Sequence, residues 1–167
     1  MLNLSKRADM MPASPIRKLV PFAQEAKKRG VKVYHLNIGQ PDIKTPELFF
    51  QAIKNFDAPV LEYALSQGNL ELIDSFREYY KKWNIDFAQD EIIITNGGSE
   101  AIIMSMMAIG DPGDEVLVPE PFYANYNGFA CEAGLEIKPI TTKAEEGFHL
   151  PSKAYIKSLI KPNTRAI

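Results

Sequence analysis

The 167-residue sequence contains one cysteine and no marked excess of charge of either sign. The single thiol, Cys131, excludes an internal disulfide and suits a reducing compartment. We expect this cysteine to be a buried helix residue rather than a nucleophile. The net charge is −2 at pH 7, so the chain lacks the basic footprint that nucleic-acid binding requires. Small, metabolite-sized partners are expected instead.

Long hydrophobic runs and clustered metal ligands are also missing. The most apolar run, residues 101–109, is well short of the ~20 residues that cross a bilayer. Residues 1–7 hold too short an apolar region for a signal peptide. The two histidines, His35 and His149, lie far apart and have no companion cysteines, which argues against a metal site. We therefore expect a cytoplasmic protein without membrane, nucleic-acid or metal partners.

Ten glycines and twelve prolines divide the rest of the sequence, which is 46% hydrophobic and 24% charged, as in ordinary globular proteins. Short apolar runs alternate with segments of helical periodicity. Such alternation predicts β-α-β units, and therefore an α/β fold with a mainly parallel sheet and helices on both faces. The expected strands are residues 31–38, 92–95, 115–118 and 135–140, with a further strand beginning at 164.

The expected helices separate these strands, and residues 1–13 are expected to form an irregular arm. Pro21 lies inside the first helical pattern, so that helix is either kinked or begins later. Residues 99–109 are apolar on most sides, and we expect them to be deeply buried. A helix from residue 69 carries one apolar stripe that we expect to be core, consisting of Leu70, Ile73, Phe76, Tyr80 and Trp83. The other expected helices are residues 14–29, 45–56, 122–133 and 151–160.

The stretch from residue 91 to 101 combines a short apolar strand, a two-glycine turn and the start of a helix. The first N–H groups of a helix have no partner within it, and the peptide dipoles place partial positive charge there. Gly97 and Gly98 allow a ligand to approach closely, and Ser99 offers a hydroxyl donor and an N-cap. The pattern predicts either an anion-binding turn or a plain capped turn. It matches neither the Walker spacing nor the dinucleotide fingerprint.

Ligands of parallel α/β sheets bind beyond the carboxyl ends of the strands. The loops that follow residues 38, 95 and 118 all lie at such ends. Gly39, Gly98, Ser99 and Tyr123 are therefore expected to face one crevice.

Four segments in this order resemble the pyridoxal phosphate enzymes of the aspartate aminotransferase class, class I and II. They are residues 36–42 (LNIGQPD), 63–68 (YALSQG), 95–101 (TNGGSEA) and 111–116 (DPGDEV), the last leading to 121–126 (PFYANY). The resemblance covers essentially all of this chain and only the first part of a full family member. It implies the first part of the large domain of a pyridoxal phosphate-dependent transferase fold. Residues 1–40 would belong to the small domain, and residues 41–167 to an incomplete large cofactor-binding domain.

The resemblance implies a cofactor role for two places, the glycine turn and the aromatic residue after residue 121. Gly97, Gly98 and Ser99 match the turn that holds the cofactor phosphate. Tyr123 matches the aromatic residue that stacks on the pyridine ring, although a one-position error would exchange it with Phe122. Offset aromatic stacking adds ~0.5 to 1.5 kcal/mol beyond the burial of area, which suits a flat ring to this task.

Two further residues match substrate and interface positions of the family. Gly39 matches the glycine whose backbone lies against the substrate α-carboxylate; the alternative is a turn glycine that ends a strand. Tyr63 matches the tyrosine that crosses the dimer interface to the cofactor phosphate of the neighbouring subunit. Otherwise Tyr63 is a half-buried packing residue of a loop.

The resemblance also implies the reaction: an aminotransferase uses pyridoxal 5′-phosphate to move an amino group between an α-amino acid and a 2-oxo acid, here as a homodimer. The catalytic lysine that binds the cofactor as a Schiff base is expected beyond Ile167, because Lys153, Lys157 and Lys161 have the spacing of a solvated helix face. This chain alone is therefore expected to be inactive. Alternatives are a non-catalytic truncated module, or another reaction of this cofactor such as decarboxylation or β-elimination.

Overall fold

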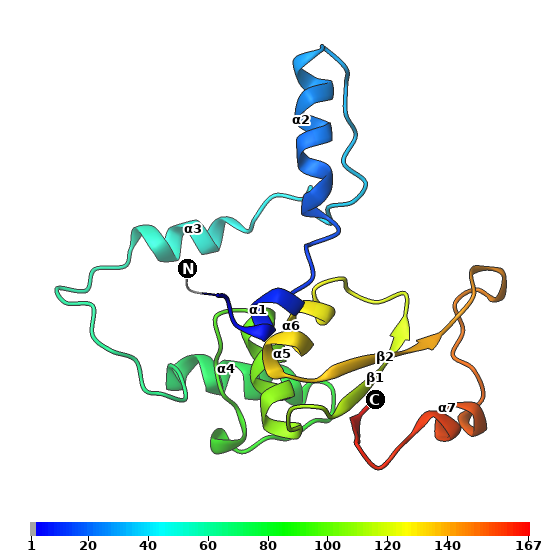
Figure 1. Ribbon diagram of the computed structural model, residues 1–167. Coiled ribbons are helices and arrows are strands. Elements are labelled where there is room, and N and C mark those ends of the chain that lie inside the picture. The colour runs from blue at the N-terminus through cyan, green and yellow to red at the C-terminus, as the bar shows by residue number, and fades with distance from the viewer. Residues whose placement is uncertain (1–2) are drawn as a thin grey trace. The chain divides into compact units, whose positions relative to one another are not determined.

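The computed structural model describes residues 3–167, and their contacts divide the chain into two units (Figure 1). The first unit combines residues 3–37 with Gly97–Ile167, and the second is Ile38–Asn96. The expected boundary between residues 40 and 41 remains a prediction. Met1 and Leu2, the beginning of the expected irregular arm, lie outside the described residues. Within the described part of the chain, no helix is long and apolar enough to cross a membrane.

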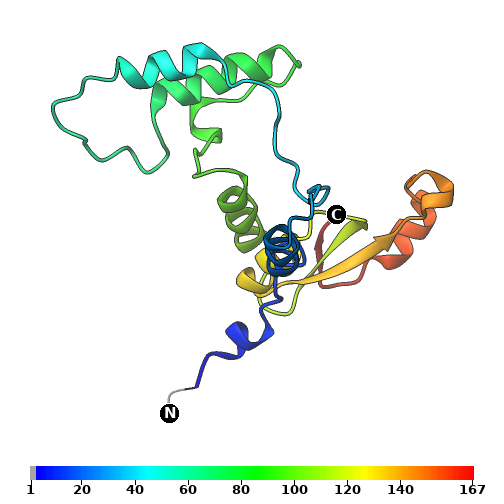
Figure 2. The ribbon, with the colours of Figure 1, turned by 90° about the horizontal axis from the view of Figure 1, so that it is seen from above.

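The first unit is built on a parallel sheet of strand order β2-β1-β3, with β1 at Glu115–Glu120, β2 at Glu136–Thr141 and β3 at Thr164–Ala166. In Figure 2 the short β3 lies beside the label of the C-terminus. The parallel α/β prediction is confirmed, and so are the strands expected near 115, 135 and 164. β1 continues through Pro119 to Glu120, two residues beyond the expected end at residue 118. β3 pairs only with Glu115 and Val116, so the later part of β1 has room for a residue without an N–H.

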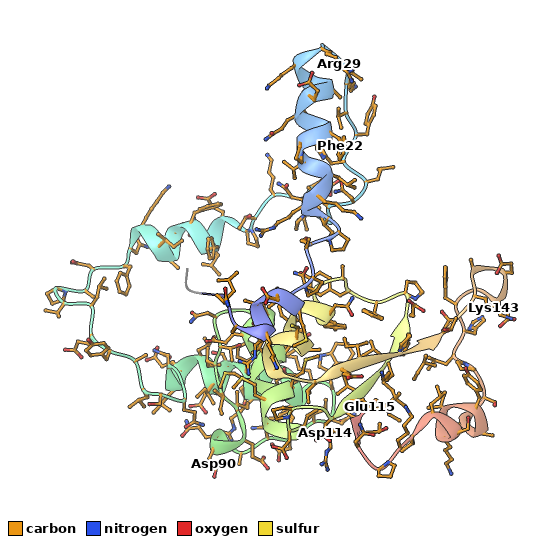
Figure 3. The ribbon with its side chains drawn as sticks, viewed as in Figure 1. Phe22, Arg29, Asp90, Asp114, Glu115 and Lys143 are labelled. Carbon is orange, nitrogen blue, oxygen red and sulfur yellow. The ribbon has the colours of Figure 1, made fainter. Side chains whose placement is uncertain are left out.

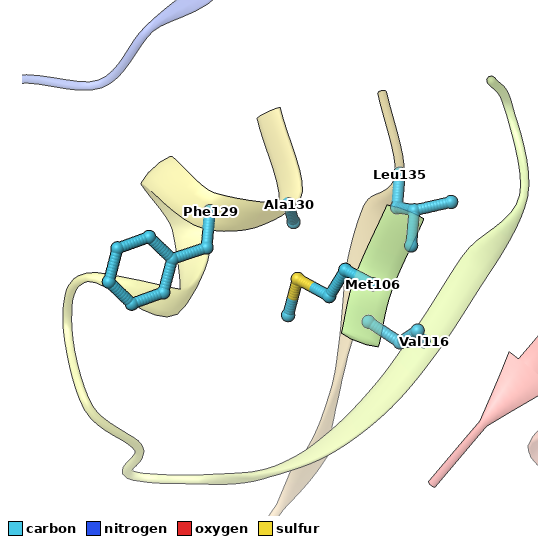
Figure 4. Packing of buried hydrophobic residues seen from close by; sticks show 5 residues of the cluster. All are labelled: Met106, Val116, Phe129, Ala130 and Leu135. Atoms are coloured by element: carbon cyan, nitrogen blue, oxygen red, sulfur yellow. The ribbon is translucent and has the colours of Figure 1, made fainter. Parts of the chain in front are cut away.

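Helices α5, at Gly98–Ile109, and α6, at Tyr126–Ala133, pack on one face of this sheet. The core cluster that they form with β1 and with the residue before β2 is drawn in Figure 4 and consists of Met106, Val116, Phe129, Ala130 and Leu135. Alternation along the strands places Leu117 and Ile140, both fully buried, on the opposite face. The expectation that residues 99–109 are deeply buried is wrong for this chain. Met106 is the one buried residue of α5, because α6 and the sheet cover only one side of it.

Two expected strands, residues 31–38 and 92–95, are not strands in the structure. The backbone of Ile92 is extended, with φ −122° and ψ 130°. A strand, however, is defined by hydrogen bonds to a neighbouring strand, and the described sheet has only three members. Ile94 N–H donates instead to the carbonyl of Gln67 at 2.9 Å.

The amino-terminal segment contains more helix than expected. Helix α1, Lys6–Met10, was missed by the sequence analysis, although Ser5 caps it by accepting from the N–H of Ala8. Helix α2 covers Val20–Lys28 after the short turn η1, Arg17–Leu19. Pro21 therefore lies in the first turn of α2, and the later start is the correct alternative.

Cys131 is half-buried on α6 rather than buried. Its thiol lies 3.6 Å from the carbonyl oxygen of Arg7, where α1 contacts α6. The connection from β2 to β3 contains η3, Ala144–Glu146, and α7, Lys153–Leu159, which Ser152 caps by accepting from the N–H of Tyr155.

The second unit contains α3, at Glu47–Lys54, α4, at Leu70–Lys81, and the turn η2, at Gln89–Glu91. Asn69 caps α4 by accepting from the N–H of Leu72. Of the stripe expected to be core, only Ile73 is buried, and the side chain of Trp83 is 66% exposed. The prediction was wrong for the rest, because α4 packs mainly on the turn at η2, where the Tyr80 and Phe87 rings meet at 5.4 Å.

Candidate functional site

The amino end of α5 and the carboxyl end of β1 lie at the same edge of the sheet. α5 precedes β1 and runs antiparallel to it, since its last turn reaches the beginning of β1: a Cβ built on Gly110 would lie 3.5 Å from the Cβ of Asp114. Ala101, in the first turn of α5, and Val118, in β1, both line an apolar pocket of about 300 Å³ between α5 and the sheet. The first turn of α5 and the loop after β1 thus lie at the same edge of the sheet, as the parallel topology predicts.

Gly97 is the N-cap of α5, and its backbone has φ 82° and ψ 176°, a conformation that is essentially restricted to glycine. A Cβ built on Gly97 or Gly98 would meet no atom within 4 Å, so no distant part of the described chain crowds the side of the backbone where a side chain would stand. Ser99 is exposed at the second helical position. The expectation that Ser99 caps the helix is wrong, because the chain enters the helix at Gly97. Its hydroxyl remains available as a predicted donor beside the first N–H groups of α5.

Tyr123 follows the end of β1, which is anchored by Thr142. The backbone N–H of Thr142 donates to the carbonyl of Glu120 at 3.1 Å, and its hydroxyl donates to the same oxygen. The Tyr123 side chain is 50% exposed. Phe122 is half-buried, and its ring stacks on Tyr126 at 6.2 Å. Of the two neighbouring rings, Tyr123 is therefore the one with more surface open to a ligand.

The opposite edge of the sheet is closed by buried carboxylates at the start of β1 (Figure 3). Glu115 is 2% exposed and accepts from the hydroxyl of Thr164 at 2.8 Å and from Lys161 Nζ at 3.4 Å. Asp114 accepts from Arg165 Nε at 2.6 Å and from the N–H of Asp111 at 2.9 Å. The hydrogen bond from Arg165 holds the pKa of the Asp114 carboxyl below its ordinary value, helped by the bond from Asp111. Lys161 is therefore engaged at the edge away from Ser99 and Tyr123.

Gly39 and Tyr63 belong to the second unit, where both are exposed. A Cβ built on Gly39 would meet nothing within 4 Å, and the Tyr63 side chain is fully exposed. Tyr63 is not the half-buried packing residue of the alternative reading. The predicted substrate and interface roles of Gly39 and Tyr63 stay predictions, as does the crevice that Gly39 was expected to share with Tyr123.

The sequence analysis gave no role to Gln67, which anchors the loop after Tyr63. Its side-chain amide donates to the carbonyls of Gln89 and Ile92. The next residue, Gly68, has φ 116°, and a Cβ there would lie 2.5 Å from the Cβ of Ile94. The signal in the sequence was the pair Gln67-Gly68, in which a polar side chain stands next to a glycine that no other residue can replace without strain.

The open edge of the first unit suits a ligand with an anionic group and a flat ring. The amino end of α5 offers N–H donors and a hydroxyl to an anion, and the Tyr123 ring offers a partly open aromatic surface. No atom lies within 4 Å of the place where a Cβ of Gly97 or Gly98 would stand, which leaves room there for a phosphate beside the backbone. The residues present therefore fit pyridoxal 5′-phosphate. Among residues 3–167, no three His, Cys, Asp or Glu side chains gather as metal ligands.

Known proteins share both this sequence and this fold. The chain is 32% identical over 169 residues to the aspartate/prephenate aminotransferase of Thermus thermophilus, covering 100% of this chain and 44% of that protein. It is 38% identical over 128 residues to the (5-formylfuran-3-yl)methyl phosphate transaminase of Methanocaldococcus jannaschii, covering 75% and 35%. The crystal structure of the aspartate aminotransferase from Rhizobium meliloti superposes with a TM-score of 0.87 at 29% identity, covering 99% of this chain and 42% of that one.

The chain thus spans less than half the length of these relatives. Its α/β fold is the first part of the fold of pyridoxal phosphate-dependent aminotransferases, a class that uses this cofactor. The family described as aminotransferase class I and II matches residues 31–167, which is most of the sequence. The chain therefore belongs to the class I and II aminotransferase family.

Proposed function

We propose that the full-length protein is a pyridoxal phosphate-dependent aminotransferase that moves an amino group between an α-amino acid and a 2-oxo acid. One structural observation carries the proposal beyond family membership. The glycine turn of α5 and the half-exposed ring of Tyr123 lie at the same edge of a parallel sheet, as the order of α5 and β1 requires. A cofactor with a phosphate and a planar ring needs both features at one edge.

In this proposal the residues of the first unit bind and orient the cofactor. The N–H groups at the start of α5 and the Ser99 hydroxyl donate to its phosphate, where the helix dipole favours negative charge. The Tyr123 ring packs against the flat face of the pyridine and fixes its plane. When bound, the cofactor supplies an electron sink for the negative charge that develops on the α-carbon of the amino acid.

The residues of the second unit contribute the substrate and partner contacts of the proposal. The backbone at Gly39, which carries no side chain, faces the α-carboxylate of the substrate. Tyr63 reaches the cofactor phosphate of a second copy in a homodimer, and its fully exposed ring leaves it free to do so. Aminotransferases for aspartate or prephenate and for a furan phosphate are among the relatives, so we propose the substrate class as an α-amino acid without naming one.

In this proposal the proton-transferring lysine is not Lys153, Lys157 or Lys161. Lys153 and Lys157 lie on α7, and Lys161 is engaged with Glu115 at the edge away from Tyr123. We propose that residues 1–167 alone do not catalyse the reaction and that the lysine belongs to the remainder of a longer protein.

The proposal is tested with the purified full-length protein. We expect a visible absorption band on addition of pyridoxal 5′-phosphate, and amino-group transfer from a panel of amino acids to 2-oxoglutarate. Absence of both the band and the transfer would overturn the proposal. Amino-group transfer without the absorption band would overturn the assignment of the cofactor. The band together with decarboxylation as the only reaction would overturn the assignment of amino-group transfer.

A matched pair of serine variants tests the phosphate site. Ser99→Ala removes the hydroxyl beside the turn, and we expect cofactor affinity to fall roughly 10-fold, the loss expected for one hydrogen bond to a charged group. Ser105→Ala is the control, because Ser105 lies on the same helix with its hydroxyl donating to the carbonyl of Ala101. Equal affinity in the two variants would remove Ser99 from the site.

The shared site is tested by mixing two inactive full-length variants. One is Tyr63→Ala, and the other lacks the catalytic lysine. Hybrid dimers contain one site with an intact lysine and an intact Tyr63 from the neighbour, so partial activity should return on mixing. A mixture that forms hybrids and stays inactive would exclude a role for Tyr63 across the interface.

A further inference from the structure

Asn125 occupies the N-cap position of α6 without capping it. Asparagine is among the residues most favoured at this position, where its side chain normally accepts from an N–H of the first helical turn. Here the backbone of Asn125 has φ −73° and ψ −15°, which is helical rather than extended, and the side chain makes no capping hydrogen bond. The side-chain amide is turned the other way, and its Nδ2 donates to the Tyr123 hydroxyl oxygen at 2.7 Å.

The Tyr123 ring is held by two further contacts from the same helix. The Tyr126 ring meets it edge-on, with centroids 5.7 Å apart and planes at 84°. The Phe129 ring lies 6.4 Å away at 56°, and Phe129 is a buried member of the core cluster. Two contacts therefore support the body of the ring, while the bond from Asn125 fixes its polar tip.

We propose that Asn125 is a positioning residue that fixes the Tyr123 ring as a preorganised surface for the planar ring of the cofactor. This inference rests on the proposed function, in which Tyr123 stacks on pyridoxal 5′-phosphate. Tyr123 lies on a loop after β1 and is half exposed, so without the bond from Asn125 the ring is held only by its contacts with Tyr126 and Phe129 and is less firmly oriented. A ligand that binds a preordered ring does not have to order it on binding, and its affinity is higher for that reason.

A double-mutant cycle in the full-length protein tests the inference. The variants are Asn125→Leu, Tyr123→Phe and the double variant, and the probe is pyridoxal 5′-phosphate titrated into apoprotein. Asn125→Leu should weaken cofactor binding about 3- to 10-fold, the range expected for one hydrogen bond, and should reduce the circular dichroism that the bound cofactor acquires. In the Tyr123→Phe background the same change should have no further effect, because the hydroxyl that Asn125 holds is gone.

A third variant separates positioning from capping. Asn125→Ser supplies a short hydroxyl side chain that does not reach the Tyr123 hydroxyl oxygen, at a position where the wild-type side chain makes no capping hydrogen bond. It should retain the thermal stability of the wild-type apoprotein and still bind the cofactor as weakly as Asn125→Leu. It also keeps the test decisive if Asn125→Leu fails to fold.

Two results would overturn the inference while leaving the proposed function intact. One is an equal loss of affinity from Asn125→Leu with and without the Tyr123 hydroxyl. The other is wild-type affinity and circular dichroism in Asn125→Ser. If the wild-type full-length protein does not bind the cofactor at all, the proposed function fails, and this inference fails with it.

Discussion

The two ends of β1 are built in opposite ways. At the amino end, Glu115 is buried and bonded to Thr164 and Lys161, and Asp114 is paired with Arg165. At the carboxyl end, the neighbouring helix begins in an open glycine turn at Gly97, and the strand leads to an exposed aromatic ring. The side-chain bonds that join β1 to β3 lie at the amino end of β1, which is here called the closed end. The carboxyl end, here called the open end, can therefore accommodate a ligand without disturbing the bonds that join β1 to β3.

The largest expected effect comes from removing the core that both ends share. Leu117→Ala deletes a side chain that is 2% exposed in the middle of β1, and we expect a loss of about 2–5 kcal/mol in the free energy of unfolding. Leu150→Ala makes the same change at a residue that is 61% exposed. Urea unfolding of both should show a loss only for the first. Similar losses would mean that β1 is not the centre of the unit.

The next prediction concerns the open end alone. Gly97→Ala places a Cβ on a backbone conformation that only glycine adopts readily, so stability should fall by about 1–3 kcal/mol. Gly128→Ala is a matched control in α6, where the new Cβ would lie 3.8 Å from the sulfur of Met11 in ordinary contact. Alanine is the better helix former, and thermal unfolding should show a gain of about 0.5–1 kcal/mol. A gain at both positions would show that the turn at Gly97 is not strained.

A change at the closed end should affect stability and leave cofactor binding unaltered. Glu115→Ala removes the acceptor of the Thr164 hydroxyl in a buried setting, and we expect a loss of about 1–2 kcal/mol. Glu136→Ala breaks an exposed pair with Lys138 and should have little effect. Chemical unfolding gives the first quantity, and titration of the full-length protein with cofactor gives the second. Weakened cofactor binding in Glu115→Ala would show that the two ends are coupled.

The smallest effect is a pH dependence at the closed end. The pKa of Asp114 is lowered in the folded state, mainly by the hydrogen bond from Arg165. A lowered pKa means that the folded state favours the charged carboxylate, so this contribution to stability is complete above the unfolded pKa of about 4. It is lost as the pH falls through the lower folded value. Urea unfolding from pH 6 to pH 3 should therefore decline less steeply in Asp114→Asn than in the wild type. Identical slopes would exclude Asp114 as the source.

Features fixed by local chemistry were predictable from the sequence. Asn69 caps α4 where a helix was expected to begin, and α6 ends at the expected residue 133, before Gly134 with φ 80°. The shared edge of Ser99 and Tyr123 also follows from the alternation of strands and helices, since parallel strands end on one side. The turn at Gly97 and Gly98 was predicted because two consecutive glycines stand directly before the helical segment.

Features that depend on distant partners were not predictable. Residues 31–38 have the composition of a strand, but no described strand pairs with them. Trp83 has the spacing of a core residue, but burial depends on what packs against its helix. The bond from Asn125 to Tyr123 depends on side-chain rotamers at the end of β1, and an N-cap asparagine gives no sequence signal for it.

The first unit is assembled from two stretches of chain with the second unit inserted between them. This order has a consequence for protein synthesis, which proceeds from the amino terminus. The carbonyl of Arg7 meets the thiol of Cys131, 124 residues later in the chain, so α1 leaves the ribosome long before α6 exists. Residues 38–96 can form their own local contacts during this interval. The first unit therefore folds only after its insertion has been made, and its amino-terminal helices wait on the nascent chain for their partners.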